Sequence, residues 1–226
     1  MDGRKADAAE REETKDRGRW RLRKVAIVGG GPTRLYAPYH DKSWDIWAFS
    51  SRDYKYPRIT RWFEIHHPTD LRQQLASRKL GRRTFADYVN FMRKLRCPVY
   101  MQARYKYIPN SVRFPIERVL DEFGRCFTST ASYMVALAML EGYNVIGLWG
   151  VNPRGKEYGP QRGALEYLLS LARQKGIRVY LPRGVNLRLR AHPEPYRTRV
   201  LYAYDWRSPG AWWRRRVRLR LRMLGR

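Results

Sequence analysis

Short apolar runs alternate with longer amphipathic segments along most of the 226-residue chain. The runs typical of buried strands lie at residues 25–28, 45–49, 61–65, 98–102, 145–149 and 177–181, with 200–204 as one further candidate. The segments between them that favour helices are residues 70–95, 116–123, 129–141 and 161–174. Strands that alternate with helices build parallel sheets, so the pattern predicts an α/β, Rossmann-like fold, a mostly parallel sheet with helices on both faces.

The charge of the chain is strongly basic, with 47 Lys and Arg against 20 Asp and Glu and a net charge of +27. We expect a charged N-terminal extension over 1–22, a nucleotide-binding domain over 23–206 and an Arg-rich arm over 207–226. The arm has a net charge of +8 and no acidic residue, and arginine alternates with apolar residues in its second half. Such a surplus favours a polyanionic partner, and nucleic acid is the first to consider.

The predicted nucleic-acid-binding residues of the arm are Arg214, Arg215, Arg216, Arg218, Arg220 and Arg222. The alternation is also typical of an edge strand whose charges prevent aggregation. Two cysteines make neither a disulfide framework nor a zinc site, and the apolar runs fall short of the roughly 18 residues of a membrane span. The N-terminus lacks the apolar core of a secretory signal. We therefore expect a cytoplasmic protein without a metal or a membrane partner, and the oligomeric state stays open.

A glycine-rich turn follows the first predicted strand. Its residues are Gly29, Gly30, Gly31, Pro32 and Thr33. Glycines let a backbone approach a ligand closely, and exposed N–H groups attract phosphate. The alternative is a tight turn between a strand and a helix without a ligand.

Hydroxyl and amide side chains mark two further candidate sites. Ser129, Thr130 and Ser132 stand at the start of the helix over 129–141, where the positive end of the helix dipole suits a phosphate or a ribose. Helix capping is the alternative. Asn152 follows the strand over 145–149 as a further nucleotide-binding candidate. The substrate-orienting candidates after it are Tyr158, Gln161 and Arg162. An ordinary polar loop explains this second group equally well.

The catalytic candidates are His66 and Glu64. They stand two residues apart at the end of a predicted strand, so both side chains point to the same side. A carboxylate beside an imidazole can act as an acid/base pair. The alternative is a hydrogen-bonded structural pair at a strand end.

The order of these motifs resembles that of a known family. Residues 25–33, Val-Ala-Ile-Val-Gly-Gly-Gly-Pro-Thr, resemble the strand and Gly-x-Gly-Pro-Ser start of small bacterial sialyltransferases that use CMP-sialic acid, and also the related hydroxymethylpterin pyrophosphokinase-like domains. Residues 128–152 are similar to the second signature of these enzymes, a Thr-Ser helix start, an alanine-rich helix and a strand ending in Gly-x-Asp. Residues 62–66, 98–102, 109–112 and 157–162 resemble uncharacterised phage-encoded proteins with the same frame.

The resemblance implies a nucleotide-dependent transferase, in first place a glycosyltransferase. Its co-substrate would be a nucleotide or nucleotide-sugar rather than a tightly bound cofactor, and it would act in the cytoplasm of a host cell if the protein is viral. On the ground of charge alone, nucleic acid is the acceptor to consider. The alternative is a non-catalytic nucleic-acid-binding or virion-associated protein with the same fold. That alternative is favoured by Asn152, where the family has an acidic residue, and by the lack of a histidine between residues 152 and 192. NAD(P) binding is a third hypothesis, although no acidic residue ends the second strand.

Overall fold

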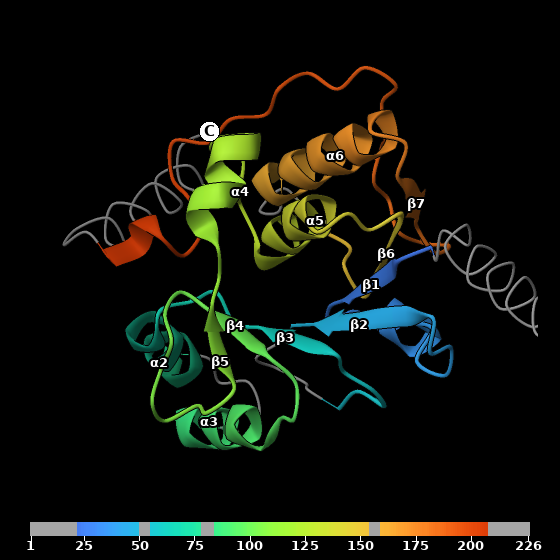
Figure 1. Ribbon diagram of the computed structural model, residues 1–226. Coiled ribbons are helices and arrows are strands. Elements are labelled where there is room, and N and C mark those ends of the chain that lie inside the picture. The colour runs from blue at the N-terminus through green and yellow to red at the C-terminus, as the bar shows by residue number, and fades with distance from the viewer. Residues whose placement is uncertain (1–21, 50–54, 78–83, 154–158, 208–226) are drawn as a thin grey trace, which may run out of the picture.

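The computed structural model describes residues 22–49, 55–77, 84–153 and 159–207 (Figure 1). The strands are β1 (Lys24–Val28), β2 (Trp44–Ala48), β3 (Arg61–Phe63), β4 (Val99–Met101), β5 (Ser111–Arg113), β6 (Val145–Trp149) and β7 (Arg178–Tyr180). The α-helices are α2 (Pro68–Ser77), α3 (Phe85–Lys94), α4 (Ile116–Phe123), α5 (Thr130–Leu140) and α6 (Gly159–Gln174). Two short 3-10 helices are η1 (Pro32–Tyr36) and η3 (Asp205–Arg207).

The seven strands form one sheet in the order β5-β4-β3-β2-β1-β6-β7, and every neighbouring pair is parallel. The predicted parallel α/β fold is therefore confirmed. The chain builds the sheet outward from β1 to β5 and then returns to add β6 on the other side of β1. The carboxyl ends of β1 and β6 thus form a topological switch point, where open sheets of this kind leave a crevice for a ligand.

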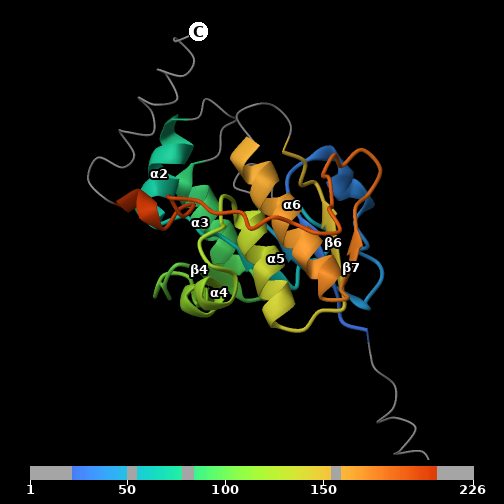
Figure 2. The same ribbon diagram turned by 90° about the horizontal axis from the view of Figure 1, so that it is seen from above.

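Helices cover both faces of the sheet, as the pattern predicted, with α4, α5 and α6 on one face and α2 and α3 on the other (Figures 1 and 2). Successive residues of β1 serve opposite faces, because strand side chains alternate. Val25 and Ile27 belong to the core beneath α5 and α6, whereas Ala26 and Val28 belong to the core on the other side. The central strand is buried from Val25 to Val28 for this reason, and polar chemistry is restricted to the strand ends.

Helix α5 lies in the middle of its layer, between α4 and α6 (Figure 2). Each residue from Thr130 to Met139 is buried, so the helix needs an apolar surface all round rather than one apolar stripe. Its connection runs from the end of β5 to the start of β6, which places its N-terminus at the edge of the sheet where the parallel strands end.

The structure corrects one predicted element and adds detail to two other stretches of the chain. Residues 200–204 are not a strand, because they form turns with Ala203 at a positive φ of 64° before η3 begins. The helix-favouring segment over 70–95 contains two helices, α2 and α3. Strand β5 is not among the predicted strands, since it has only three residues and a single apolar one, Val112.

The predictions for the two extensions fall on residues 1–21 and 208–226, outside the described residues. The three-part division of the chain therefore stays a prediction. Within the described residues, no helix is both long and apolar enough to cross a membrane.

Candidate functional site

Three groups of predicted site residues meet at the carboxyl edge of the sheet. The glycine-rich turn follows β1, Gly150 and Asn152 follow β6, and Glu64 and His66 follow β3. Strand β2 separates β1 from β3, so the glycine turn and the Glu64–His66 pair lie two strand spacings apart, roughly 10 Å.

The turns after β1 and β6 are packed directly against each other. Gly29 N–H donates to the Trp149 carbonyl over 2.8 Å, and Gly31 N–H donates to the Gly150 carbonyl over 2.9 Å. A Cβ on Gly29 would lie 2.6 Å from the Gly150 carbonyl oxygen, and a Cβ on Gly150 would lie 2.5 Å from that of Gly29. The switch point is thus closed by two backbones in contact, which only glycine allows.

Some residues of the glycine-rich turn are used in this packing, whereas others are exposed. Gly29 and Gly31 use their N–H groups within the fold, and the Thr33 hydroxyl accepts a hydrogen bond from Gly150 N–H over 2.7 Å. Pro32 opens η1. Gly30 is exposed at the tip of the turn, and its carbonyl accepts a hydrogen bond from the guanidinium of Arg34 over 2.9 Å. A fixed positive charge therefore stands at the mouth of the switch point.

The hydroxyls at the start of α5 form a capping box. Ser129 Oγ accepts from Ser132 N–H over 3.3 Å, and Ser132 Oγ accepts from Ser129 N–H over 3.2 Å. Thr130, the first residue of the helix, is 6% exposed. Helix capping accounts for the hydroxyls of Ser129 and Ser132. The geometry therefore directly supports capping, which is the alternative to nucleotide binding. A role of Ser129, Thr130 and Ser132 toward a ligand stays a prediction.

Asn152 and Arg162 brace the loops beside the switch point. The Asn152 amide donates to the Gly184 carbonyl over 2.8 Å, and Arg162 donates from two nitrogens to the Pro153 carbonyl. Gln161 is half-buried in the first turn of α6. Tyr158 lies outside the described residues. Asn152 and Arg162 therefore fix the conformation of the turn after β6.

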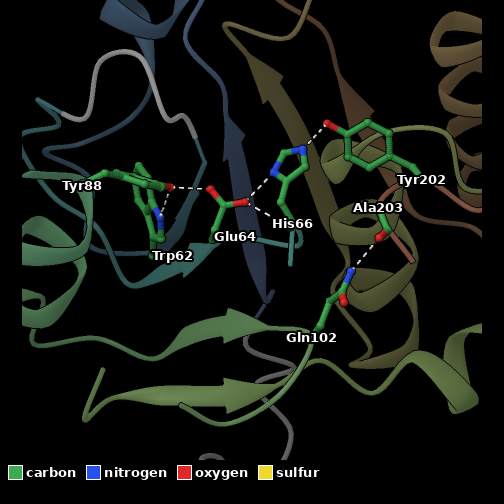
Figure 3. Close-up of polar contacts among 7 residues, drawn as sticks. All are labelled: Trp62, Glu64, His66, Tyr88, Gln102, Tyr202 and Ala203. Carbon is green, nitrogen blue, oxygen red and sulfur yellow. Dashed lines mark hydrogen bonds and ion pairs between the residues drawn. The ribbon is translucent and has the colours of Figure 1, made fainter. Parts of the chain in front are cut away.

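Glu64 and His66 form the closest acid/base contact at this edge (Figure 3). His66 Nδ1 lies 2.5 Å from Glu64 Oε1, and the backbone N–H of His66 donates to the same oxygen over 3.0 Å. The carboxylate is 4% exposed and the imidazole 11%. The prediction that the two side chains share one side of the chain is confirmed.

Hydrogen bonds extend from Glu64 into the core. Tyr88 of α3 donates its hydroxyl to Glu64 Oε2 over 2.7 Å, and Trp62 Nε1–H donates to the Tyr88 oxygen over 3.0 Å. Burial by itself raises the pKa of Glu64, but the facing His66 and the hydrogen bonds from His66 and Tyr88 outweigh it and hold that pKa below its usual value. Glu64 is therefore an ionised, buried carboxylate.

Two aromatic residues that the sequence analysis missed complete the surroundings of His66. The Tyr202 hydroxyl lies 2.8 Å from His66 Nε2, and the Trp206 ring packs with its centroid 5.4 Å from that of the imidazole. Both come from the C-terminal segment 198–207, which lies along the loop before α5, because the N–H groups of Thr198 and Tyr202 donate to the carbonyls of Arg125 and Phe127. No local pattern in residues 200–206 points to His66, because the contact joins residues 136 positions apart.

Tyr56 connects the two parts of the site. Its hydroxyl donates to the Gly29 carbonyl over 3.3 Å, and its ring packs edge-on against Trp62 with centroids 5.8 Å apart. Trp62 in turn holds Tyr88 and, through it, Glu64. The glycine turn and the acid/base pair are therefore joined by a continuous chain of contacts.

No group of three or more His, Cys, Asp and Glu side chains that could hold a metal ion is found in the described part of the chain. The arrangement offers acid/base chemistry at His66 and a positive charge at Arg34.

No protein-family model matches the chain, and no curated protein matches it. Among solved structures, it is similar to the sialyltransferase CstII from Campylobacter jejuni in complex with CMP-3FNeuAc, with 17% identity, a TM-score of 0.46, and 79% of this chain and 90% of that chain covered. The same enzyme with cytidine-5′-monophosphate gives 16% identity, a TM-score of 0.49, and coverage of 87% and 99%. The apo α-2,3-sialyltransferase from Campylobacter jejuni gives 14% identity and a TM-score of 0.44, with 90% of this chain and 96% of that chain covered. The resemblances to phage proteins and to pterin kinase-like domains stay predictions.

Proposed function

We propose that the protein is a glycosyltransferase that moves a sugar from a nucleotide-activated donor to an acceptor hydroxyl. One observation carries the proposal: a buried, ionised carboxylate holds an imidazole at the edge of a parallel sheet, two strands from the topological switch point. A base of this type removes the proton of an attacking hydroxyl. The switch point is where such folds bind nucleotides.

The donor would bind at the switch point. The exposed tip at Gly30 lets a pyrophosphate approach the backbone, and the Arg34 guanidinium offsets its charge. Gly29 and Gly31 act indirectly, since they keep the two turns in contact. The motif resemblance over residues 128–152 makes a cytidine nucleotide the first donor to test, with Ser129 and Asn152 beside it.

The reaction would be a displacement at the anomeric carbon of the sugar. The acceptor hydroxyl loses its proton to the Glu64–His66 pair while its oxygen bonds to that carbon, and the bond from the carbon to the donor phosphate breaks. The ionised Glu64 stabilises the imidazolium that forms. Arg34 stabilises the departing phosphate, and Arg162 and Gln161 would orient the donor through the turn after β6.

Nucleic acid is the proposed acceptor, on the ground of charge. The chain carries a net +27, and a small anionic donor does not need the acid-free arm over 207–226. The second candidate function is a non-catalytic nucleic-acid-binding protein of the same fold. It is favoured by the capping box, because Ser129 and Ser132 satisfy each other without a ligand.

Thermal unfolding separates the two functions. We expect CMP, UDP or another nucleotide at 100-fold excess over its dissociation constant to stabilise the protein by about 2.7 kcal/mol, seen as a rise in Tm of a few degrees at moderate salt. Stabilisation by oligonucleotides but not by nucleotides, with an affinity that falls steeply between 50 and 200 mM salt, favours the binding protein and contradicts the enzyme.

A further inference from the structure

His66 is enclosed by protein groups. Its side chain is 11% exposed, Nδ1 contacts Glu64 and Nε2 contacts the Tyr202 hydroxyl. Trp206 packs on the imidazole as well. An acceptor hydroxyl therefore cannot reach a ring nitrogen of His66 while Tyr202 stays in place. The half-buried Tyr202 is the group that occupies the Nε2 side of the imidazole (Figure 3).

The hydrogen bonds around Glu64 have one consistent direction in the neutral form of His66, the form that can take up a proton. The Trp62 indole N–H can only donate, so Tyr88 accepts from it and donates its own proton to Glu64. Glu64 is ionised and can only accept, so the proton between Glu64 and His66 belongs to Nδ1. Neutral His66 then has its lone pair on Nε2, and the Tyr202 hydroxyl donates to it. The phenol is thus aligned to give up its proton.

The backbone of Tyr202 is held firmly in this position. Its N–H donates to the Phe127 carbonyl over 3.0 Å, and its carbonyl accepts from the Tyr133 hydroxyl over 3.0 Å. The next residue, Ala203, is fully buried at a φ of 64°, and its carbonyl accepts from buried Gln102 over 2.9 Å. A non-glycine residue keeps such a strained backbone only where its surroundings enforce it, and strain of this kind gathers at functional sites.

We infer that Tyr202 is the catalytic residue that meets the acceptor, and that Glu64, His66 and Tyr202 form a carboxylate–imidazole–phenol relay. The inference rests on the proposed function. As the acceptor oxygen bonds to the sugar carbon, its proton passes to the Tyr202 oxygen and the Tyr202 proton passes to His66 Nε2. The leaving nucleotide phosphate takes the electron pair of the broken bond. The imidazolium, paired with Glu64, then returns its proton to solvent.

The first test is Tyr202→Phe, which removes the hydroxyl and keeps the ring packed on His66. We expect kcat for transfer to fall at least about 100-fold, with KM for the donor within about threefold of the wild type. The matched control is Tyr180→Phe, because Tyr180 is a half-exposed phenol at the end of β7, four strands along the sheet from β3, and it should keep wild-type rates. Retention of transfer by Tyr202→Phe together with its loss in His66→Gln would overturn the relay, since His66 would then act directly on the acceptor.

A second measurement does not depend on turnover. Nitrogen-15 NMR of histidine-labelled protein should show neutral His66 as the Nδ1–H tautomer, and Tyr202→Phe should shift the Nε2 resonance while Tyr180→Phe leaves it unchanged. An Nε2–H tautomer in the wild type would overturn the inference, because Tyr202 would then accept rather than donate. If no donor is turned over by the wild type, the proposed function fails, and the tautomer alone decides whether the relay exists.

Discussion

Glu64 is the residue on which the proposed chemistry of the site depends. It is 4% exposed, yet its two oxygens accept hydrogen bonds from His66 and Tyr88, which keep it charged in the core. An unpaired buried charge strongly destabilises the folded state, so the charged carboxylate depends on both of its partners. The same contacts fix the orientation of His66.

Glu64→Gln therefore tests the pair through stability. The amide brings N–H donors to a position that faces the donors of His66 and Tyr88, so we expect a loss of about 2–4 kcal/mol in the free energy of unfolding at pH 7, measured by urea denaturation. The folded-state pKa of Glu64 lies below its usual value. The stability it contributes is therefore present above the usual carboxylate range and is lost as the pH falls through the lowered pKa.

The stability gap between the wild type and Glu64→Gln should thus be constant near neutral pH and narrow below about pH 4.5. A gap that stays the same at acid pH would show that Glu64 is not ionised in the folded protein. Tyr180→Phe again serves as the control, with stability close to that of the wild type at each pH.

Part of this site could be predicted from the sequence, and part of it could not. Glu64 and His66 were predictable because they are two residues apart, and period two alone puts them on one side of a strand. Tyr202 was not predictable, because it meets His66 across a separation of 136 residues. Only the path of the C-terminal segment along the loop before α5 brings the two together, and no local periodicity encodes that contact.

The elements that would hold the proposed donor are the two turns after β1 and β6. Their contact rests on Gly29 and Gly150, each of which would bring a Cβ within 2.6 Å of the other's carbonyl oxygen. Gly150 also has a φ of 64°, in the left-handed region that glycine occupies at no steric cost. The shape of the switch point is therefore sensitive to a single methyl group.

Gly150→Ala should destabilise the fold and abolish stabilisation by nucleotides. The matched control is Gly176→Ala, because Gly176 has a φ of 80° and nothing within 4 Å of its Cβ position. Both variants bear the backbone cost of about 1 kcal/mol, and only Gly150→Ala adds a steric clash with the turn after β1. Thermal unfolding with and without nucleotide measures both effects, and equal loss of nucleotide response in the two variants would contradict a donor site at this turn.

Elements were predictable where burial imposes a strong pattern. Strands β1, β2 and β6 are central and apolar, and α5 is bounded by a serine cap and Gly142, so their sequences specify them nearly alone. Strand β5 stands at the edge of the sheet and has one apolar residue, so its pairing with β4 depends on tertiary structure. Residues 200–204 mimic a strand in composition, but their N–H groups bond to a turn and to Phe127 instead of to a strand.

At the scale of the whole molecule, the C-terminal segment links the sheet to the basic arm. Arg125 pairs with Asp205, and Asp205 accepts from the backbone N–H of Leu201, so the segment is fastened to the body just before the described residues end at 207. Trp206, beside His66, therefore stands immediately before the acid-free stretch over 207–226. The arm proposed to bind a polyanion therefore joins the described part of the chain beside His66.

We propose that this edge transfers a sugar from a nucleotide donor with His66 as part of its base. The most direct measurement is transfer of labelled sugar from a panel of nucleotide-sugars to DNA and to oligosaccharides, with wild type, His66→Gln and His192→Gln compared. We predict product with at least one donor, a rate at least about 100-fold lower in His66→Gln, and a normal rate in His192→Gln, whose histidine is exposed. Absence of product from every donor, or full activity in His66→Gln, would contradict the account.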